Sequence, residues 1–218
     1  RHVIMLELSH TVDGIARKNL AGLPTIALVQ CSIDAPPLAS HAIEGIVYCC
    51  NVIQHTPSVE KTARALFDLA APGGEFVFNC YPLNDGTPLR WLRYHVVQKG
   101  MRAILSRQSF GTILAYANTM ARLRTIPGLG NFLEKAGFSV TGEVPTIAGE
   151  SRADHQSRVR RATALNTFDG FGSHAYQHHK SDDEIRSLVR ELGAARVLNE
   201  REYFAKPPPI GCSLRLFA

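Results

Sequence analysis

One stretch, Glu44–Pro57, restricts the fold of this chain more than any other. It is an apolar run, Gly45-Ile46-Val47-Tyr48-Cys49-Cys50, that ends abruptly in Asn51-Val52-Ile53-Gln54-His55-Thr56-Pro57. A short apolar run bounded by Gly and by polar residues predicts a strand that is covered on both faces. In open α/β sheets ligands bind at the carboxyl ends of the strands, so the polar residues that follow this run are candidates for a binding site.

The segments around this run alternate between apolar runs and helical patterns. Short links between such segments predict a parallel, doubly wound sheet. A pair of prolines excludes a strand between residues 31 and 38. Pro57 suits the first position of the helix that follows, and Pro72-Gly73-Gly74 ends that helix. We predict strands at 3–6, 25–30, 46–52 and 75–81, and helices at about 12–20 and 58–70.

Residues 82–175 interrupt this alternation with apolar residues at helical spacing. The spacing predicts two or three helices with a break near Ser109, a looser stretch over 127–149, and a helix over 152–165. Ser181-Asp182-Asp183-Glu184 then has the pattern of a capping box, and Gly193 ends the helix that it opens. Residues 197–204 and 212–217 predict an antiparallel strand pair. We therefore expect a core made of 1–81 and 176–218, with 82–175 as a helical cap.

Charge is unevenly distributed along the chain. The formal net charge is +5, and no acidic residue occurs from Gly86 to Leu133. That segment contains Arg90, Arg93, Lys99, Arg102, Arg107, Arg122 and Arg124. Such a run suits an anionic ligand, phosphates or a membrane surface, although solvated cations are an equally good explanation.

The cysteines and the hydropathy indicate a protein of the cytoplasm. Cys31, Cys49, Cys50, Cys80 and Cys212 form no C-x-x-C pair and mostly lie in apolar runs, which favours buried thiols in a reducing compartment. No stretch approaches the roughly 18 apolar residues that a membrane span needs.

The order of these signals resembles the class I S-adenosylmethionine-dependent methyltransferases. The resemblance rests on Leu6-Glu7-Leu8-Ser9, on the loop 30–38, on 51–57 and on Ala71-Pro72-Gly73-Gly74-Glu75, and it covers residues 1–81 and, more loosely, 176–218. It implies a Rossmann-like, mostly parallel sheet with the strand order 3-2-1-4-5-7-6. It also implies S-adenosyl-L-methionine as the cofactor.

Two features depart from the family pattern. The glycine-rich loop that follows the family's first strand is absent, so we expect that strand to be missing and the chain to be a piece of a longer protein. Many relatives also have an acid at the position of Ser32, where a hydroxyl accepts a hydrogen bond without the help of a charge.

The resemblance implies cofactor-binding roles for residues that follow predicted strands. Glu7 and Leu8 would lie beside the ribose, Ser32 and Ile33 beside the adenine, and the backbone of Asn51 beside the methionyl group. Each residue also has a structural explanation. Glu7 suits a solvated helix start, Ile33 suits the core, and Asn51 suits the cap of a strand.

Candidates for the chemistry of methyl transfer follow the third and fourth predicted strands. His55 is a candidate base, and Tyr81 a candidate wall of the acceptor pocket, although His55 equally suits a hydrogen-bonding role. Arg90, Arg93 and Arg102 are candidates for binding the acceptor. His174, His178 and His179 lack an acidic neighbour at ligand spacing, so we expect no metal site.

The leading hypothesis is a methyltransferase that acts on a small-molecule or lipid-like acceptor, an anionic one included, beneath the helical cap. A nucleic-acid (RNA) methyltransferase or binder is the alternative that the basic run favours. A non-catalytic remnant or scaffold is a third hypothesis, which the missing glycine loop favours. A dehydrogenase fits the strand-and-acid signal alone, but the patterns at 51–57 and 72–74 disfavour it. The oligomeric state and the atom methylated do not follow from the sequence.

Overall fold

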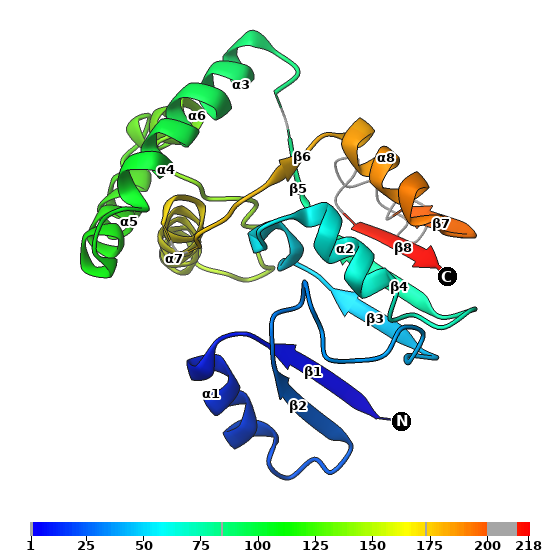
Figure 1. Ribbon diagram of the computed structural model, residues 1–218. Coiled ribbons are helices and arrows are strands. Elements are labelled where there is room, and N and C mark those ends of the chain that lie inside the picture. The colour runs from blue at the N-terminus through cyan, green and yellow to red at the C-terminus, as the bar shows by residue number, and fades with distance from the viewer. Residues whose placement is uncertain (1, 84, 173, 200–212) are drawn as a thin grey trace. The chain divides into compact units, whose positions relative to one another are not determined.

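The computed structural model describes residues 2–83, 85–172, 174–199 and 213–218 (Figure 1). The chain divides into two compact units. Unit 1 consists of Arg1–Leu83 and His178–Ala218, and unit 2 of Asn84–Gln177. Unit 1 contains every strand that the structure describes, whereas the regular elements described in unit 2 are helices.

The first part of unit 1 is a parallel strand pair joined by a helix. Strand β1 (Val3–Glu7), helix α1 (His10–Leu20) and strand β2 (Ile26–Gln30) follow one another, and β1 pairs with β2 in parallel. The register places Glu7 opposite Gln30, so both strands end in a polar residue at the same edge. These elements confirm the strand, helix and strand predicted over residues 3–30.

A second sheet of four strands carries the rest of unit 1. Its order is β3 (Ile46–Cys49), β4 (Glu75–Asn79), β8 (Ser213–Phe217) and β7 (Arg196–Asn199). β3 and β4 run parallel, and β8 is antiparallel to both of its neighbours. The antiparallel pair predicted near the end of the chain is confirmed over the residues that the structure describes, and the predicted strand residues 200–204 and 212 lie outside them.

Within each sheet the strand order agrees with a segment of the expected order. The pair β2-β1 corresponds to 3-2, and the sheet β3-β4-β8-β7 corresponds to 4-5-7-6. β1 and β3, expected to be neighbours across a gap, share no ladder among the described residues. Each therefore presents a strand edge that no described strand pairs.

Caps set the ends of the helices that cover the second sheet. α2 (Val59–Phe67) begins after Ser58, whose hydroxyl accepts from the backbone N–H of Lys61 at 3.2 Å. The prediction that Pro57 opens this helix was wrong, because a serine side chain satisfies a free N–H of the first turn, which proline cannot do. α8 (Asp182–Leu192) has the predicted capping box, and it ends at Gly193 in the left-handed conformation.

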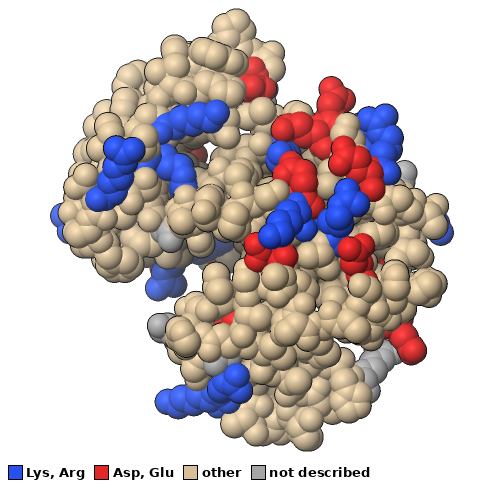
Figure 2. All heavy atoms as spheres, in the orientation of Figure 1, with Lys and Arg blue, Asp and Glu red and all other residues tan. Residues whose placement is uncertain are grey.

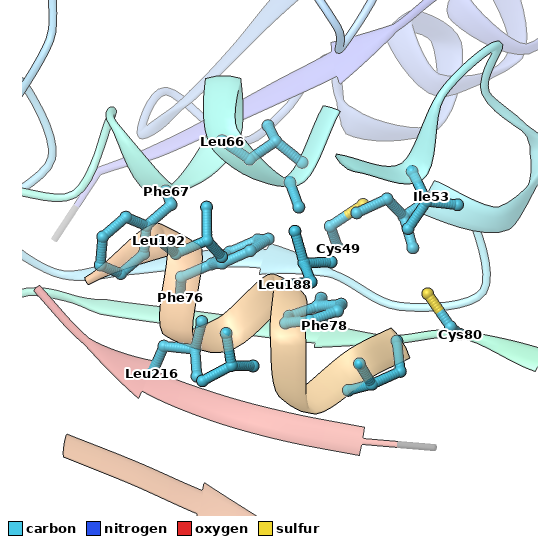
Figure 3. Packing of buried hydrophobic residues seen from close by; sticks show 14 of the residues in the cluster. Cys49, Ile53, Leu66, Phe67, Phe76, Phe78, Cys80, Leu188, Leu192 and Leu216 are labelled. Atoms are coloured by element: carbon cyan, nitrogen blue, oxygen red, sulfur yellow. The ribbon is translucent and has the colours of Figure 1, made fainter. Parts of the chain in front are cut away.

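Side chains from α2, α8 and the second sheet form the core of unit 1 (Figure 3). The rings of Phe76 and Phe78, both from β4, stack with centroids 4.9 Å apart. Leu66 of α2, Leu188 of α8 and Leu216 of β8 complete the packing, and all of these side chains are buried. The prediction that the strand after Gly45 is covered on both faces was wrong, because Ile46 and Tyr48 of β3 are 59% and 72% exposed.

Two short elements extend this core at the carboxyl ends of the parallel strands. The 3₁₀ turn η1 (Ile53–His55) follows β3. The strands β5 (Tyr81–Pro82) and β6 (His179–Lys180) form a short parallel pair, in which Tyr81 lies opposite His179. The pair joins the segment that leaves the core near Leu83 to the segment that returns to it near His178.

Unit 2 is helical, as the spacing of its apolar residues predicts. The prediction that 127–149 is looser was wrong over α6, and the helix predicted over 152–165 extends to Phe171. The bend near Ser109 is confirmed, because its side chain caps the next helix. The elements are α3 (Pro88–Leu92), the π-helical turn η2 (Arg93–Gln98), α4 (Lys99–Leu105), α5 (Phe110–Arg124), α6 (Leu129–Ala136) and α7 (Arg152–Phe171).

The interior of unit 2 combines small and polar residues. Thr163 and Thr167 of α7 are fully buried, and their hydroxyls bond to Thr141 and to the backbone of Val140.

In the part of the chain that the structure describes, no helix has the length and apolar character needed to cross a membrane.

Candidate active site

The turn η1 is held in place by hydrogen bonds from several directions. The hydroxyl of Thr56 donates to the carbonyl oxygen of Ile53 at 2.8 Å, and the hydroxyl of Thr62 donates to that of Thr56 at 2.9 Å. His178 then bonds to the turn twice. Its backbone N–H donates to the carbonyl oxygen of Gln54 at 2.9 Å, and its Nε2 lies 3.0 Å from that of Thr56. Because a carbonyl only accepts, Nε2 of His178 carries the proton.

Three rings form a row beside this turn. The imidazole of His55 meets the ring of Tyr81 edge-on, with centroids 5.5 Å apart and an angle of 86°. Tyr81 in turn lies 5.5 Å from the ring of His179. The structure thus brings together the two residues predicted for catalysis, and it adds His179, whose place follows from its register with Tyr81. All three side chains are half-buried.

Gln54 is the most unusual residue of the site, and the sequence predictions did not single it out. Its side chain is fully buried, and neither Oε1 nor Nε2 has a hydrogen-bond partner among the residues that the structure describes. Buried amides nearly always have such partners, because burying one without them is costly. The only signal in the sequence is that Gln54 lies in the polar run that ends the central strand.

Asn51 and Asn79 join the carboxyl ends of β3 and β4. Asn51 has a φ of 59°, a left-handed conformation that asparagine adopts more readily than most residues. Its backbone N–H donates to Oδ1 of Asn79 at 2.5 Å, and Nδ2 of Asn79 donates to Oδ1 of Asn51 at 2.9 Å. The pair therefore fixes a tight turn at the end of the central strand, and Asn79 is a second residue that sequence reasoning missed.

Glu7 ends β1 with its carboxylate half-buried. Oε1 accepts from the backbone N–H of Ser9 at 2.7 Å, and Oε2 has no hydrogen-bond partner among the described residues. Leu8 is exposed, and its carbonyl oxygen accepts a weak bond from Gln30 at 3.5 Å. One carboxylate oxygen thus orders the turn, while the other remains available at the carboxyl edge of the first sheet.

The loop after β2 carries an acid that the sequence predictions overlooked. The hydroxyl of Ser32 donates to Oδ1 of Asp34, and Oδ2 of Asp34 lies 4.0 Å from Nζ of Lys61. Ile33 packs against the edge of the hydrophobic core. The loop therefore presents a carboxylate close to Ser32, two residues after the position where many relatives have one.

The cations predicted to bind the acceptor have different environments within unit 2. Arg90 is exposed on α3, whereas Nε of Arg93 is buried. Arg102 donates to the carbonyl oxygens of Gly170 and His174, and to Oε1 of Gln177 at 2.9 Å. These partners are distant in sequence, and the bonds tie α4 to the end of α7 and to the segment after it. Burial lowers the pKa of Arg102, although Asp169 and Tyr94 act in the opposite direction.

Two further observations concern the predicted histidine cluster and the cysteines. His174 does have an acidic partner, since its Nε2 lies 2.8 Å from Oδ1 of Asp169. Cys49 and Cys80 are buried and form no disulfide among the described residues, and Cys212 lies outside them. Burial, reinforced by the neighbouring Cys50, raises the pKa of Cys49 to about 12, so this thiol is not a nucleophile at neutral pH.

Charged residues are distributed differently in the two units. On the face shown in Figure 2, Lys and Arg intermingle with Asp and Glu over α2 and α8 of unit 1. Lys180 there bonds to Glu60 at 2.5 Å and to Glu184 at 3.3 Å. The blue residues of unit 2 have few red neighbours on the same face, in keeping with the acid-free segment of its sequence.

Comparison with known proteins finds one family model that matches the first part of the chain. Residues 1–78 match the family model described as "Methyltransferase domain". No curated protein matches the chain.

Solved structures resemble the chain at low sequence identity. The DszA carbon methyltransferase is 10% identical, with a TM-score of 0.50 over 100% of this chain and 40% of that one. The CMeT domain of the citrinin polyketide synthase is 11% identical, with a TM-score of 0.48 over 99% of this chain and 38% of that one. A possible histamine N-methyltransferase from Thermotoga maritima is 12% identical, with a TM-score of 0.43 over 98% and 72%.

The chain thus spans about two fifths of the length of the DszA and citrinin structures. The likeness to DszA concerns the fold, and the family match concerns the segment from β1 to β4. Residues 1–78 are therefore similar to methyltransferase domains, and the chain shares the α/β fold of the DszA carbon methyltransferase.

Proposed function

We propose that the protein is an S-adenosylmethionine-dependent methyltransferase that acts on a small-molecule or lipid-like acceptor. The observation that carries the proposal is the family match over residues 1–78, combined with the strand order of unit 1. Polar residues follow β1, β2 and β3 where the family binds its cofactor. The bound cofactor would supply a methyl group that its sulfonium already activates.

The described residues fit the adenosyl part of this cofactor. Oε2 of Glu7 is available to accept from a ribose hydroxyl, and the turn to Ser9 fixes the direction of the carboxylate. Ser32 and Ile33 would border the adenine, with Asp34 supplying the carboxylate that Ser32 lacks. The left-handed turn at Asn51 would present its backbone to the methionyl group.

The ring row beside η1 supplies the groups that methyl transfer needs. His55 would accept a proton from the acceptor, and Tyr81 would orient the imidazole through the edge-on contact of their rings. Proton removal and alignment are sufficient roles for the protein, because the cofactor supplies the activation.

Unit 2 would select the acceptor. Arg90 is the strongest candidate among its cations, because its side chain is exposed whereas the guanidinium of Arg102 bonds to the backbone of its own unit. An anionic group on a lipid-like acceptor would suit Arg90. Arg93 and Arg102 would then act indirectly, by holding the helices in place.

Calorimetry with S-adenosylhomocysteine tests the proposal. Replacement of Glu7 by Ala should weaken binding by about 1–3 kcal/mol, the usual value of a charge-assisted hydrogen bond. Glu44→Ala is the matched control, since this exposed acid precedes β3 and lies outside the proposed site. Equal affinity of the native protein and the Glu7 variant would remove Glu7 from the cofactor site, and no binding by the native chain would contradict the proposal.

A nucleic-acid methyltransferase is the second candidate, and the acid-free segment from Gly86 to Leu133 favours it. Binding of RNA through this segment should weaken steeply with salt, because each phosphate contact releases counterions. Replacement of Arg90 by Gln distinguishes the two candidates. In a methyltransferase of small molecules this replacement should raise the KM for the acceptor. In a nucleic-acid methyltransferase it should reduce the salt dependence of RNA binding.

A further inference from the structure

The buried carboxamide of Gln54 lacks a hydrogen-bond partner among the described residues. Both of its polar atoms lack hydrogen bonds among the described residues, and the side chain has no exposed surface. A buried amide in this state destabilises the fold unless something else bonds to it. An unsatisfied polar group in a native protein therefore needs an explanation, and a functional role is one of them.

The backbone around Gln54 is held by several hydrogen bonds. The carbonyl oxygen of Gln54 is bonded to His178, and the residues before and after it are tied together through Thr56. Ile53, its neighbour in η1, is fully buried in the hydrophobic core. The backbone of η1 is thus rigid, and a rigid scaffold is what a binding group requires.

The position of Gln54 agrees with a binding role. It follows β3 at the carboxyl edge of the parallel strands, where ligands bind in sheets of this kind. The next residue, His55, begins the ring row with Tyr81 and His179, and its half-buried imidazole is the adjacent group that reaches solvent. A ligand bonded to Gln54 would therefore lie close to the proposed base.

We propose that the carboxamide of Gln54 binds the methyl acceptor, and that the bound part of this acceptor is uncharged. The bound part would present a hydrogen-bond donor next to a hydrogen-bond acceptor. An amide has this arrangement, and so does a hydroxyl or enol next to a carbonyl. The inference rests on the proposed function, since it assigns a residue and a substrate class to the same site.

The chemistry of the carboxamide leads to this class of ligand. Oε1 only accepts and Nε2 only donates, so a ligand must offer one group of each kind to satisfy both. A carboxylate would bond to Nε2 and leave Oε1 facing a like charge. An ammonium group would leave Nε2 unpaired. Either ion would also lose its hydration in a site whose neighbour Ile53 is fully buried in the core.

Matched small probes test the proposal without knowledge of the natural substrate. Acetamide has the predicted donor and acceptor, and acetate has nearly the same shape with a negative charge. The native protein, labelled with ¹⁵N-glutamine, would be titrated with each probe in the presence of S-adenosylhomocysteine. We expect acetamide to shift the side-chain amide resonance of Gln54 in a saturable manner, and acetate to leave it in place.

Variants show whether the carboxamide itself binds the probe. Gln54→Leu and Gln54→Met keep the volume of the side chain and remove its polar atoms, and each should weaken acetamide binding about tenfold. Gln108→Leu is the matched control, because this glutamine lies on the surface of unit 2. It should bind acetamide like the native protein.

Two results would overturn the proposal. Either the Gln54 resonance does not move with acetamide, or the Leu and Met variants bind acetamide as tightly as the native protein. Calorimetry with S-adenosylhomocysteine on the same samples separates this failure from that of the proposed function. Intact cofactor binding with no effect of acetamide at Gln54 would refute only the role of Gln54.

Discussion

Replacement of Gln54 by Leu should stabilise the protein in the absence of ligand. The native side chain is fully buried with Oε1 and Nε2 unpaired among the described residues, and such a group costs about 1–3 kcal/mol. Leu has a similar volume, so the exchange creates little cavity. The branched shape of Leu opposes part of the gain, usually by less than about 1.5 kcal/mol.

The net effect should be an increase in the free energy of unfolding of about 1 kcal/mol or more. In a chain of this size each kcal/mol corresponds to a shift of about 2–4 °C in Tm. Scanning calorimetry together with urea denaturation would measure both quantities. Gln54→Ala provides the contrast, because it also removes the amide but leaves a cavity in the core and should therefore be less stable than Gln54→Leu.

A Leu variant clearly less stable than the native protein would refute this reasoning. It would mean that the amide has partners in solution, and the basis for a ligand at Gln54 would then be lost. A Leu variant that is more stable and yet binds acetamide poorly would show that stability is sacrificed for binding at this position.

Three further predictions concern the fold itself. Ser181→Ala should lower the free energy of unfolding by about 1 kcal/mol, because the capping box of α8 is lost, and denaturant titration would measure this. Gly130→Ala should disrupt unit 2, since the added Cβ would overlap the carbonyl oxygen of Arg124, whereas Gly100→Ala meets open space and should retain the helical circular dichroism of the native protein. The folded pKa of Cys49, about 12, lies above the usual value for a thiol, so its contribution to stability is complete below about pH 8.5 and declines as the pH rises towards 12. Denaturation at pH 8 and pH 10 should therefore show a smaller loss of stability in Cys49→Ala than in the native protein.

Local patterns determined the elements of unit 1. The apolar runs at 46–49 and 75–79 were recognisable as strands from composition, but composition did not reveal that Ile46 and Tyr48 are exposed. Ser181 and Gly193 marked the ends of α8, because capping depends on residues that are close in sequence. The start of α2 was misplaced because Pro57 and Ser58 both suit a helix start, and the hydroxyl of Ser58 made the decisive bond.

Tertiary structure alone decided the details of the candidate site. Glu7, Asn51 and His55 follow predicted strands, so sequence reasoning could nominate them. The partners of these residues come from distant segments: Asn79 for Asn51, and Tyr81 for His55. No local pattern encodes such pairings, since they depend on the register and the packing of separate strands.

Gln54 and Arg102 both show that the sequence does not reveal whether a polar group is available for binding. In the sequence, Gln54 is one polar residue among several, and only the three-dimensional packing removes both water and partners from its amide. Arg102 lies in an acid-free segment, which made it a candidate for binding a ligand, yet the chain folds carbonyl groups from residues 170 and 174 onto it. The sequence determines which groups are present, but the availability of a group depends on its neighbours in space, which only the folded chain assembles.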